Sequence, residues 1–266
     1  MKFNLCQGVL LVKPDGEIVE IGPEIRNKEF RKGVRLTFTN STSVVLDHTG
    51  YLAVFERDVI GYQTPGLLFK PELTPAELKN APFIRNRDRA RAEIAKAAGK
   101  EAGDSLWLEF GVAEGNSARM WLKHLPADCE LHLFDTFEGL PEAWNTGDGD
   151  IPIPVGERAC PVPSFDDSRV KIFRGLFEDV LPSYNFIKKV GFVHIDCDIY
   201  PGAICALEAI SQHIRKGTII LFDELYGYTN YEHNEWKALT EWRHHNPTIH
   251  IEWLWRSMWL AGGRIV

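Results

Sequence analysis

Acidic residues follow two apolar runs in the second half of the sequence. Asp196 and Asp198 come directly after one run, and Asp223 and Glu224 come directly after the next. Residues two apart in a strand share a face, so Asp196 and Asp198 should point the same way. If the two runs are neighbouring strands, the carboxylates converge and raise one another's pKa values. A hard divalent cation such as Mg²⁺ would relieve that repulsion, so the pattern favours a metal or catalytic site over a set of strand-end caps.

A turn framed by Gly111 and Gly115 follows an earlier apolar run. Such a turn brings bare backbone N–H groups to the carboxyl end of a strand, where open α/β sheets bind nucleotide-like ligands. The spacing differs from the Gly-x-Gly-x-x-Gly of dinucleotide-binding proteins, and no Lys-Ser/Thr pair makes it a P-loop. Glu109, near the end of the run, favours a cationic amino-acid ligand over a pyrophosphate. Asn116 or Ser117 is expected to cap the helix that follows.

Asp135 ends the next predicted strand. An acid at that position can accept hydrogen bonds from both ribose hydroxyls of a bound adenosine. The alternative is an N-cap for the residues that follow, and the glycine turn earlier in the chain favours the ribose. We expect His194 to face away from Asp196 and to be structural, and Cys197 to pack in the interior.

From residue 106 onward, apolar runs alternate with helical segments. This alternation predicts a Rossmann-like, doubly wound α/β fold with a mostly parallel, seven-stranded sheet. No helix separates the last two strands, so one of them must run antiparallel. The glycine- and proline-rich stretch between Asp135 and Val170 is expected to form a substrate lid. The predicted strands cover residues 106–110, 131–134, 170–173, 192–195, 218–222, 249–255 and 259–266, and the predicted helices cover 85–98, 118–124, 202–214 and 231–244.

We divide the chain into a small β-rich appendage (1–70), a helical connector (71–105) and the sheet domain (106–266). In the connector, Thr74 to Glu77 is typical of a capping box with Pro75 at the first helical position. The next helix could bring arginines to a substrate phosphate, although a solvated face paired with Asp88 and Glu93 is the preferred interpretation. The arginines concerned are Arg85, Arg87, Arg89 and Arg91.

The amino-acid composition limits the classes of binding partner. A net charge of −7 argues against a nucleic-acid or anionic-membrane surface, because phosphate binding needs clustered Lys and Arg. The sequence has 5 cysteines without CxxC spacing, which points to reduced thiols in a cytoplasmic protein. No signal peptide and no apolar run long enough for a membrane span is recognisable. We therefore expect a small-molecule partner, and a homo-oligomer remains possible.

Several segments occur together in a specific order and resemble the macrocin O-methyltransferase family over about residues 85–266. They are Leu-Glu-Phe-Gly-Val-Ala-Glu-Gly-Asn-Ser (108–117), Phe-Asp-Thr-Phe-Glu-Gly-Leu-Pro-Glu (134–142), Arg-Gly-Leu-Phe-Glu-Asp-Val-Leu-Pro (174–182), His-Ile-Asp-Cys-Asp-Ile-Tyr (194–200) and Phe-Asp-Glu (222–224). The resemblance implies an S-adenosylmethionine-dependent methyltransferase on a Rossmann-like sheet. Members of the family methylate sugar hydroxyls on antibiotics and related natural products.

The resemblance also implies roles for individual residues. Asp196, Asp223 and Glu224 would hold Mg²⁺, and Asp198 would act as the general base. Glu224 stands where the family has a second Asp, and residues 1–70 are not part of the family's common core. The residues around S-adenosylmethionine would be Glu109, Gly111, Val112, Ala113, Gly115, Ser117, Asp135, Thr136 and Phe137.

We therefore expect a Mg-dependent O-methyltransferase that acts on a sugar or another natural-product-like small molecule. Three alternatives remain open on the same fold. They are a metal-independent methyltransferase, a nicotinamide-dependent oxidoreductase, and a non-catalytic nucleotide- or sugar-binding protein.

Overall fold

The computed structural model describes residues 69–101, 103–148 and 152–266 in full, and seven short strands before residue 69 by their backbone pairing. These strands pair antiparallel as β1–β2, β3–β6 and β5–β4–β7. The division of the chain at residues 70 and 105 stays a prediction. The strands are β1 (Leu10–Val12), β2 (Ile18–Glu20), β3 (Arg26–Phe30), β4 (Arg35–Phe38), β5 (Ser43–Val45), β6 (Gly50–Val54) and β7 (Val59–Gln63).

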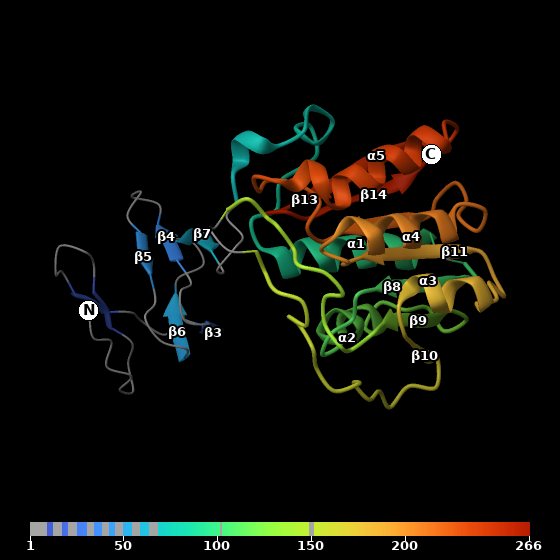
Figure 1. Cartoon of the computed structure of the whole chain (residues 1–266), viewed down its shortest axis with the longest axis horizontal. Helices are drawn as coiled ribbons and strands as arrows, with labels where there is room; N and C mark the ends of the chain where they lie inside the picture. The colour runs from blue at the N-terminus through green and yellow to red at the C-terminus, as the bar shows by residue number, and fades with distance from the viewer. Residues whose placement is uncertain are drawn as a thin grey trace.

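A seven-stranded sheet forms the centre of the fold (Figure 1). Its strands are β8 (Leu106–Phe110), β9 (Glu130–Asp135), β10 (Val170–Arg174), β11 (Val190–Ile195), β12 (Ile219–Phe222), β13 (Ile251–Arg256) and β14 (Ala261–Ile265). They lie in the order β10-β9-β8-β11-β12-β14-β13, and β14 alone runs antiparallel to the other six. The predicted mostly parallel sheet with one antiparallel strand near its end is confirmed. The strand order reverses between β8 and β11, where α/β sheets open a crevice at their carboxyl ends.

Helices cover both faces of this sheet. Ile94 of α1 and Trp121 of α2 pack in one core, on the face that also receives Trp107 of β8. Leu207 of α4 and Trp242 of α5 pack in the other core, and these two helices lie side by side (Figure 1). None of the helices in the described ranges is long and apolar enough to cross a membrane. The helices are α1 (Arg87–Glu101), α2 (Asn116–Leu122), α3 (Phe177–Val180), α4 (Tyr200–Ile210) and α5 (Glu235–His245).

Two predicted helix starts are wrong. Thr74 does not begin a helix, because its hydroxyl donates to the Pro71 carbonyl and only a 3₁₀ turn, η2 (Ala76–Leu78), follows. The N-cap of α2 is Gly115, in the left-handed conformation at φ 75°, rather than Asn116 or Ser117. Further 3₁₀ turns are η1 (Pro71–Leu73), η3 (Leu181–Ser183) and η4 (Tyr231–His233).

The long loop between β9 and β10 is folded back on itself where it is described. Leu140 N–H donates to the Glu157 carbonyl at 2.9 Å, and Trp144 forms an isolated bridge with Ile153. The loop is also attached to the segment after β12, since Asn230 N–H donates to the Thr146 carbonyl at 2.8 Å. These contacts hold the loop over the carboxyl end of the sheet, and its function as a substrate lid remains a prediction.

Candidate active site

A cavity of about 770 Å³ opens at the carboxyl ends of the central strands. Most of the residues expected to contact a cofactor line it, and so do all four acids predicted for metal binding and catalysis. The long loop contributes further lining residues, including Leu140 and Arg158. The predicted residues that line the cavity are Gly111, Val112, Ala113, Ser117, Asp135, Thr136, Asp196, Asp198, Asp223 and Glu224.

Gly111 allows the turn after β8 to approach the turn after β11. Its φ is 89°, and a Cβ atom there would lie 1.8 Å from the carbonyl oxygen of Asp196. The Asp196 N–H in turn donates to the Phe110 carbonyl at 2.9 Å. A side chain at position 111 would therefore push apart the two turns that carry the predicted cofactor residues and Asp196.

Asp135 organises the glycine turn. Its Oδ2 accepts the backbone N–H groups of Val112 and Ala113 at 2.7 and 2.9 Å, and its Oδ1 accepts that of Phe137 at 2.7 Å. Two of the backbone N–H groups that were expected to face a ligand are thus already bound. No helix follows Asp135, so the alternative of a helix N-cap is wrong. A lone pair on Oδ1 is left for a ribose hydroxyl.

Three of the residues expected around a cofactor lie outside the cavity lining. Glu109 is 0% exposed and accepts hydrogen bonds from the Ser117 hydroxyl and, at 3.1 Å, from His194 Nδ1. It therefore cannot contact a methionine ammonium in this structure and instead positions Ser117, which does line the cavity. Phe137 is buried in the core beside α2. Gly115 faces the loop, and a Cβ atom at this position would lie 2.7 Å from the Phe165 ring.

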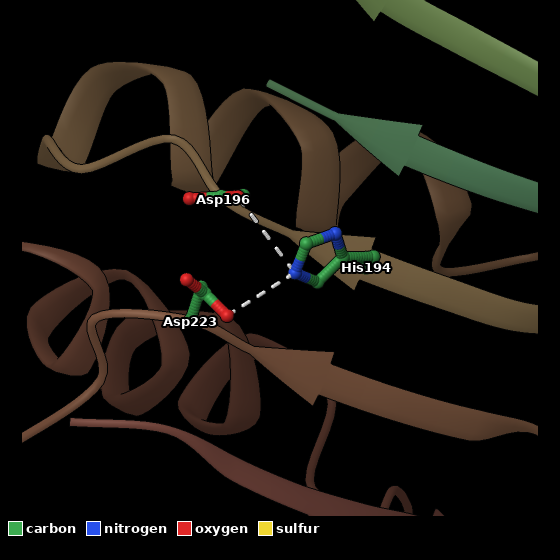
Figure 2. Close-up of side chains that lie close together, drawn as sticks. All are labelled: His194, Asp196 and Asp223. Atoms are coloured by element: carbon green, nitrogen blue, oxygen red, sulfur yellow. Dashed lines mark ion pairs between the residues drawn. The ribbon is translucent and has the colours of Figure 1, made fainter. Parts of the chain in front are cut away.

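His194 points toward the acids and not away from them (Figure 2). Its Nε2 lies 3.6 Å from Asp223 Oδ1 and 3.9 Å from Asp196 Oδ2, while its Nδ1 faces Glu109. The sequence interpretation was wrong because His194 and Asp196 are two apart in the chain and so share a face. Burial lowers the pKa of His194, but its contacts with Asp223 and Glu109 outweigh burial and raise it. Carboxylates on both ring nitrogens favour the imidazolium form.

Two arginines of α1 neutralise Asp223. Arg91 Nε lies 2.9 Å from Asp223 Oδ1, and its Nη2 reaches Oδ2. Arg87 Nη2 contacts Asp223 Oδ2 and lies 2.9 Å from Glu224 Oε1. Burial alone would raise the pKa of Asp223, yet the two guanidiniums hold it well below its usual range.

The preferred interpretation of these arginines as a solvated face is therefore wrong for Arg87 and Arg91. They are one helical turn apart, and this i, i+4 spacing is the signal in the sequence that places both on one face of α1. Glu93, an expected partner, pairs with Lys96 instead. Asp88 does contact Arg91, at 3.2 Å.

Asp196 and Asp198 have no comparable ion pair within the described ranges. Burial and the charge of Glu224 raise the pKa of Asp198 to about 8, and burial and Asp223 raise the pKa of Asp196 well above its ordinary value. Arg158 of the long loop contributes positive charge on their open side. Cys197, between them, is buried and contacts the Phe110 carbonyl, as a packing residue would.

The acids fit a divalent cation, and the set expected from the sequence, Asp196, Asp223 and Glu224, stays a prediction. Asp223 is bound by both arginines, so it is poorly placed to bind a metal as well. Oxygen atoms of Asp196, Asp198 and Glu224 lie within 4.8 Å of one another. Glu224 Oε2 is buried without a hydrogen-bond partner among the described residues, so this oxygen is available to bind a cation. A cation at this place would be held by Asp196 and Glu224.

The described cysteines, Cys129, Cys160, Cys197 and Cys205, are free thiols, while Cys6 lies outside the described residues. Cys205 lies in the cavity wall. The thiols other than Cys129 have raised pKa values, mainly because of burial. A thiol with a raised pKa is a poor nucleophile at neutral pH, so none of these three is a candidate for covalent catalysis.

Comparison with known proteins gives a consistent result. A family model described as "Methyltransferase domain" matches residues 108–225, the stretch that holds the glycine turn and all four acids. The calicheamicin methyltransferase CalS11 superposes with a TM-score of 0.53 at 18% identity, over 68% of this chain and 80% of that one. The O-methyltransferase NovP superposes with a TM-score of 0.52 at 18% identity, over 67% and 78%. At such identity these two structures establish the fold alone. None of the curated proteins compared matches the chain.

The matching family is broader than the macrocin O-methyltransferases, so that more specific resemblance stays a prediction. The matched residues 108–225 include the glycine turn and the four acids that line the cavity. Residues 108–225 therefore match a methyltransferase domain, and this match covers the strands and turns that build the cavity.

Proposed function

We propose that this protein transfers a methyl group from S-adenosylmethionine to a hydroxyl of a small molecule, in particular a sugar or another natural-product-like acceptor. The observation that carries the proposal is the shared cavity. The turn fixed by Gly111 and Asp135 and the acids Asp196 and Asp198 lie in one wall, where a cofactor and a hydroxyl could meet. The O-methyltransferase NovP and the calicheamicin methyltransferase CalS11 have the same fold, which supports this choice.

The charge of the cavity favours a sulfonium cofactor over a nicotinamide dinucleotide. Nine carboxylates line it, against three guanidiniums and no lysine. Such a wall attracts the positive sulfonium and ammonium groups and repels a pyrophosphate. The Val112 and Ala113 N–H groups, which would cradle a pyrophosphate, are bound by Asp135. The same wall favours acceptors without phosphate groups. The carboxylates are Asp88, Glu114, Asp135, Glu142, Glu178, Asp196, Asp198, Asp223 and Glu224.

In the proposed complex the cofactor lies along the glycine turn. Gly111, Val112, Ala113 and Ser117 contact its methionine portion, and Asp135 with Thr136 contacts the ribose. Glu109 acts indirectly by fixing the Ser117 hydroxyl. Leu140 of the long loop and Phe177 of α3 add apolar lining and exclude water from the acceptor side.

Asp198 is the proposed general base. As the acceptor oxygen attacks the methyl carbon, an O–C bond forms, the S–C bond breaks and the hydroxyl proton passes to an Asp198 carboxylate oxygen. A positioned base typically contributes about 10²–10⁴-fold. Holding both reactants in line contributes much of the remaining acceleration.

A divalent cation such as Mg²⁺ would supply Lewis acidity and lower the pKa of the acceptor hydroxyl. Asp196 and Glu224 would hold it, since Mg²⁺ is usually bound by one or two carboxylates and keeps several waters. Asp223 stays in its contacts with Arg87 and Arg91. The proposed set differs from the one expected from the sequence by leaving out Asp223.

The test compares parent enzyme and Asp198→Asn. Calorimetry with S-adenosylmethionine should show binding to both, while NADH should bind to neither. Methyl transfer to a panel of sugar-bearing acceptors should be seen with the parent and not with Asp198→Asn. EDTA should stop the transfer by the parent. Equal turnover by Asp198→Asn would remove the base from the proposal, and NADH binding without S-adenosylmethionine binding would favour the oxidoreductase. Cofactor binding without transfer to any acceptor would favour a non-catalytic protein.

A further inference from the structure

Asp198 occupies a strained turn. It is a non-glycine residue with a φ of 61°, and the Ile199 N–H donates to the Cys197 carbonyl at 2.6 Å across it. A hydrogen bond from residue i+2 to residue i around a positive φ is the rare form of the γ-turn. A non-glycine residue in such a region is strained and persists only where its surroundings hold it.

Part of that restraint comes from a different part of the chain. Glu235 is the first residue of α5 and is 0% exposed. Its Oε1 accepts the backbone N–H of Cys197 at 3.1 Å, directly before the strained residue. An acid in the first turn of a helix ordinarily faces solvent and the helix dipole. Here it is turned inward onto the backbone of the acid-bearing turn.

Glu235 does not belong to the cavity wall, so it does not reach the cofactor or the acceptor. Its other oxygen, Oε2, has no hydrogen-bond partner among the described residues. Keeping a buried carboxyl with only one of its oxygens bonded costs free energy. Burial and the nearby Glu224 and Asp198 raise the pKa of Glu235 well above its ordinary value, which lessens that cost. Because the Oε2 atom still lacks a hydrogen-bond partner, a contribution to stability alone poorly explains a buried Glu235.

We infer that Glu235 is a positioning residue, which holds the Asp196–Asp198 turn by its bond to the Cys197 N–H and so aims the Asp198 carboxylate at the acceptor. The inference rests on the proposed function of Asp198 as the base. It adds a further element to the site, because α5 fixes the backbone geometry of the acids that follow β11. Losing the bond frees the turn to relax, and a shift of about 1 Å in a reacting group can cost on the order of 10²-fold in rate.

Glu235→Gln and Glu235→Met separate this role from simple packing. Gln keeps an acceptor oxygen at the same reach, whereas Met keeps the length and removes the acceptor. We expect Glu235→Gln to retain kcat within about threefold, and Glu235→Met to lose about 10- to 100-fold in kcat. The Kd for S-adenosylmethionine should stay near the parent value in both. Glu241→Met is the matched control, because Glu241 lies on the same helix and binds the Tyr200 hydroxyl at 2.6 Å. It should keep kcat.

The inference fails if Glu235→Met turns over like the parent, or if Glu235→Gln loses as much as Glu235→Met. If Glu235→Met does not fold, Glu235→Asp replaces it, since a side chain shorter by one methylene cannot span the distance to Cys197. Parental kcat in that variant also overturns the inference.

Crystal structures of the variants make the test independent of turnover. Asp198 should keep its positive φ in Glu235→Gln and leave it in Glu235→Met. If the parent methylates no acceptor, the proposed function fails, and these structures alone decide the positioning role. An unchanged Asp198 φ in Glu235→Met would then refute it.

Discussion

Removal of the Arg91 side chain tests most directly whether the arginines of α1 neutralise the buried Asp223 carboxylate. Its guanidinium contacts both oxygens of Asp223, with Nε 2.9 Å from Oδ1, and the side chains are 18% and 4% exposed. Arg91→Met would leave the Asp223 carboxylate buried, with Arg87 as its remaining guanidinium partner and His194 facing Oδ1.

The expected cost follows from these contacts. Removing one partner of a buried ion pair typically costs about 3–5 kcal/mol. Arg87 still contacts Asp223, so we expect the lower end of that range, a loss of about 3 kcal/mol in the free energy of unfolding. Urea unfolding followed by circular dichroism should show this loss as a lower midpoint at an unchanged m-value.

Arg89→Met is the matched control, since Arg89 lies on the exposed face of the same helix. It should change the free energy of unfolding by no more than about 0.5 kcal/mol. Arg91→Lys keeps the charge but loses the two-point contact, so it should fall between the two. Equal stability of Arg91→Met and Arg89→Met would refute the reasoning that α1 neutralises Asp223.

Two further substitutions test other parts of the argument. Gly111→Ala would place a Cβ 1.8 Å from the Asp196 carbonyl oxygen at a φ of 89°. The substitution should lower the free energy of unfolding by more than about 2 kcal/mol and weaken S-adenosylmethionine binding in calorimetry. An unchanged melting temperature would contradict the close approach. The hydrogen bonds from Arg169 lower the pKa of Asp167 from 3.8 to about 2. Because the folded pKa lies below the unfolded one, this stabilisation is present above about pH 4 and is lost as the pH falls through about 2. Asp167→Asn should therefore lower the melting temperature at pH 7, with the difference closing toward pH 2, and a difference that persists undiminished at pH 2 would count against the pair.

The strands of the sheet were predictable because of how they are buried. β8 and β11 are covered on both faces, so each is a mostly apolar run, with one buried polar residue near its end, Glu109 in β8 and His194 in β11. Helix starts were less predictable. Ser117 has the composition of a cap, yet its hydroxyl binds the buried Glu109, and local sequence does not reveal a partner that lies below the turn.

The acids of the site could be predicted because parallel strands deliver their carboxyl ends to one edge. The groups that act on these acids could not, because they come from other elements. Whether Arg87 and Arg91 face solvent or Asp223 depends on how α1 packs across the sheet. Glu235 stands at a helix start, where an acid is ordinary, and only the fold shows that its carboxyl group turns inward to Cys197.

Backbone contacts set the distance between the cofactor turn and the acids. The Asp196 N–H bonds to the Phe110 carbonyl, and Gly111 leaves room for the Asp196 carbonyl, so the turns after β8 and β11 must move together. Asp198 follows in its own strained turn, which the contact with Glu235 restrains separately. Methyl transfer needs reacting atoms about 3–3.5 Å apart, so a small shift of either turn is costly. A change at Gly111 should therefore weaken cofactor binding and turnover together, whereas a change at Glu235 should separate the two.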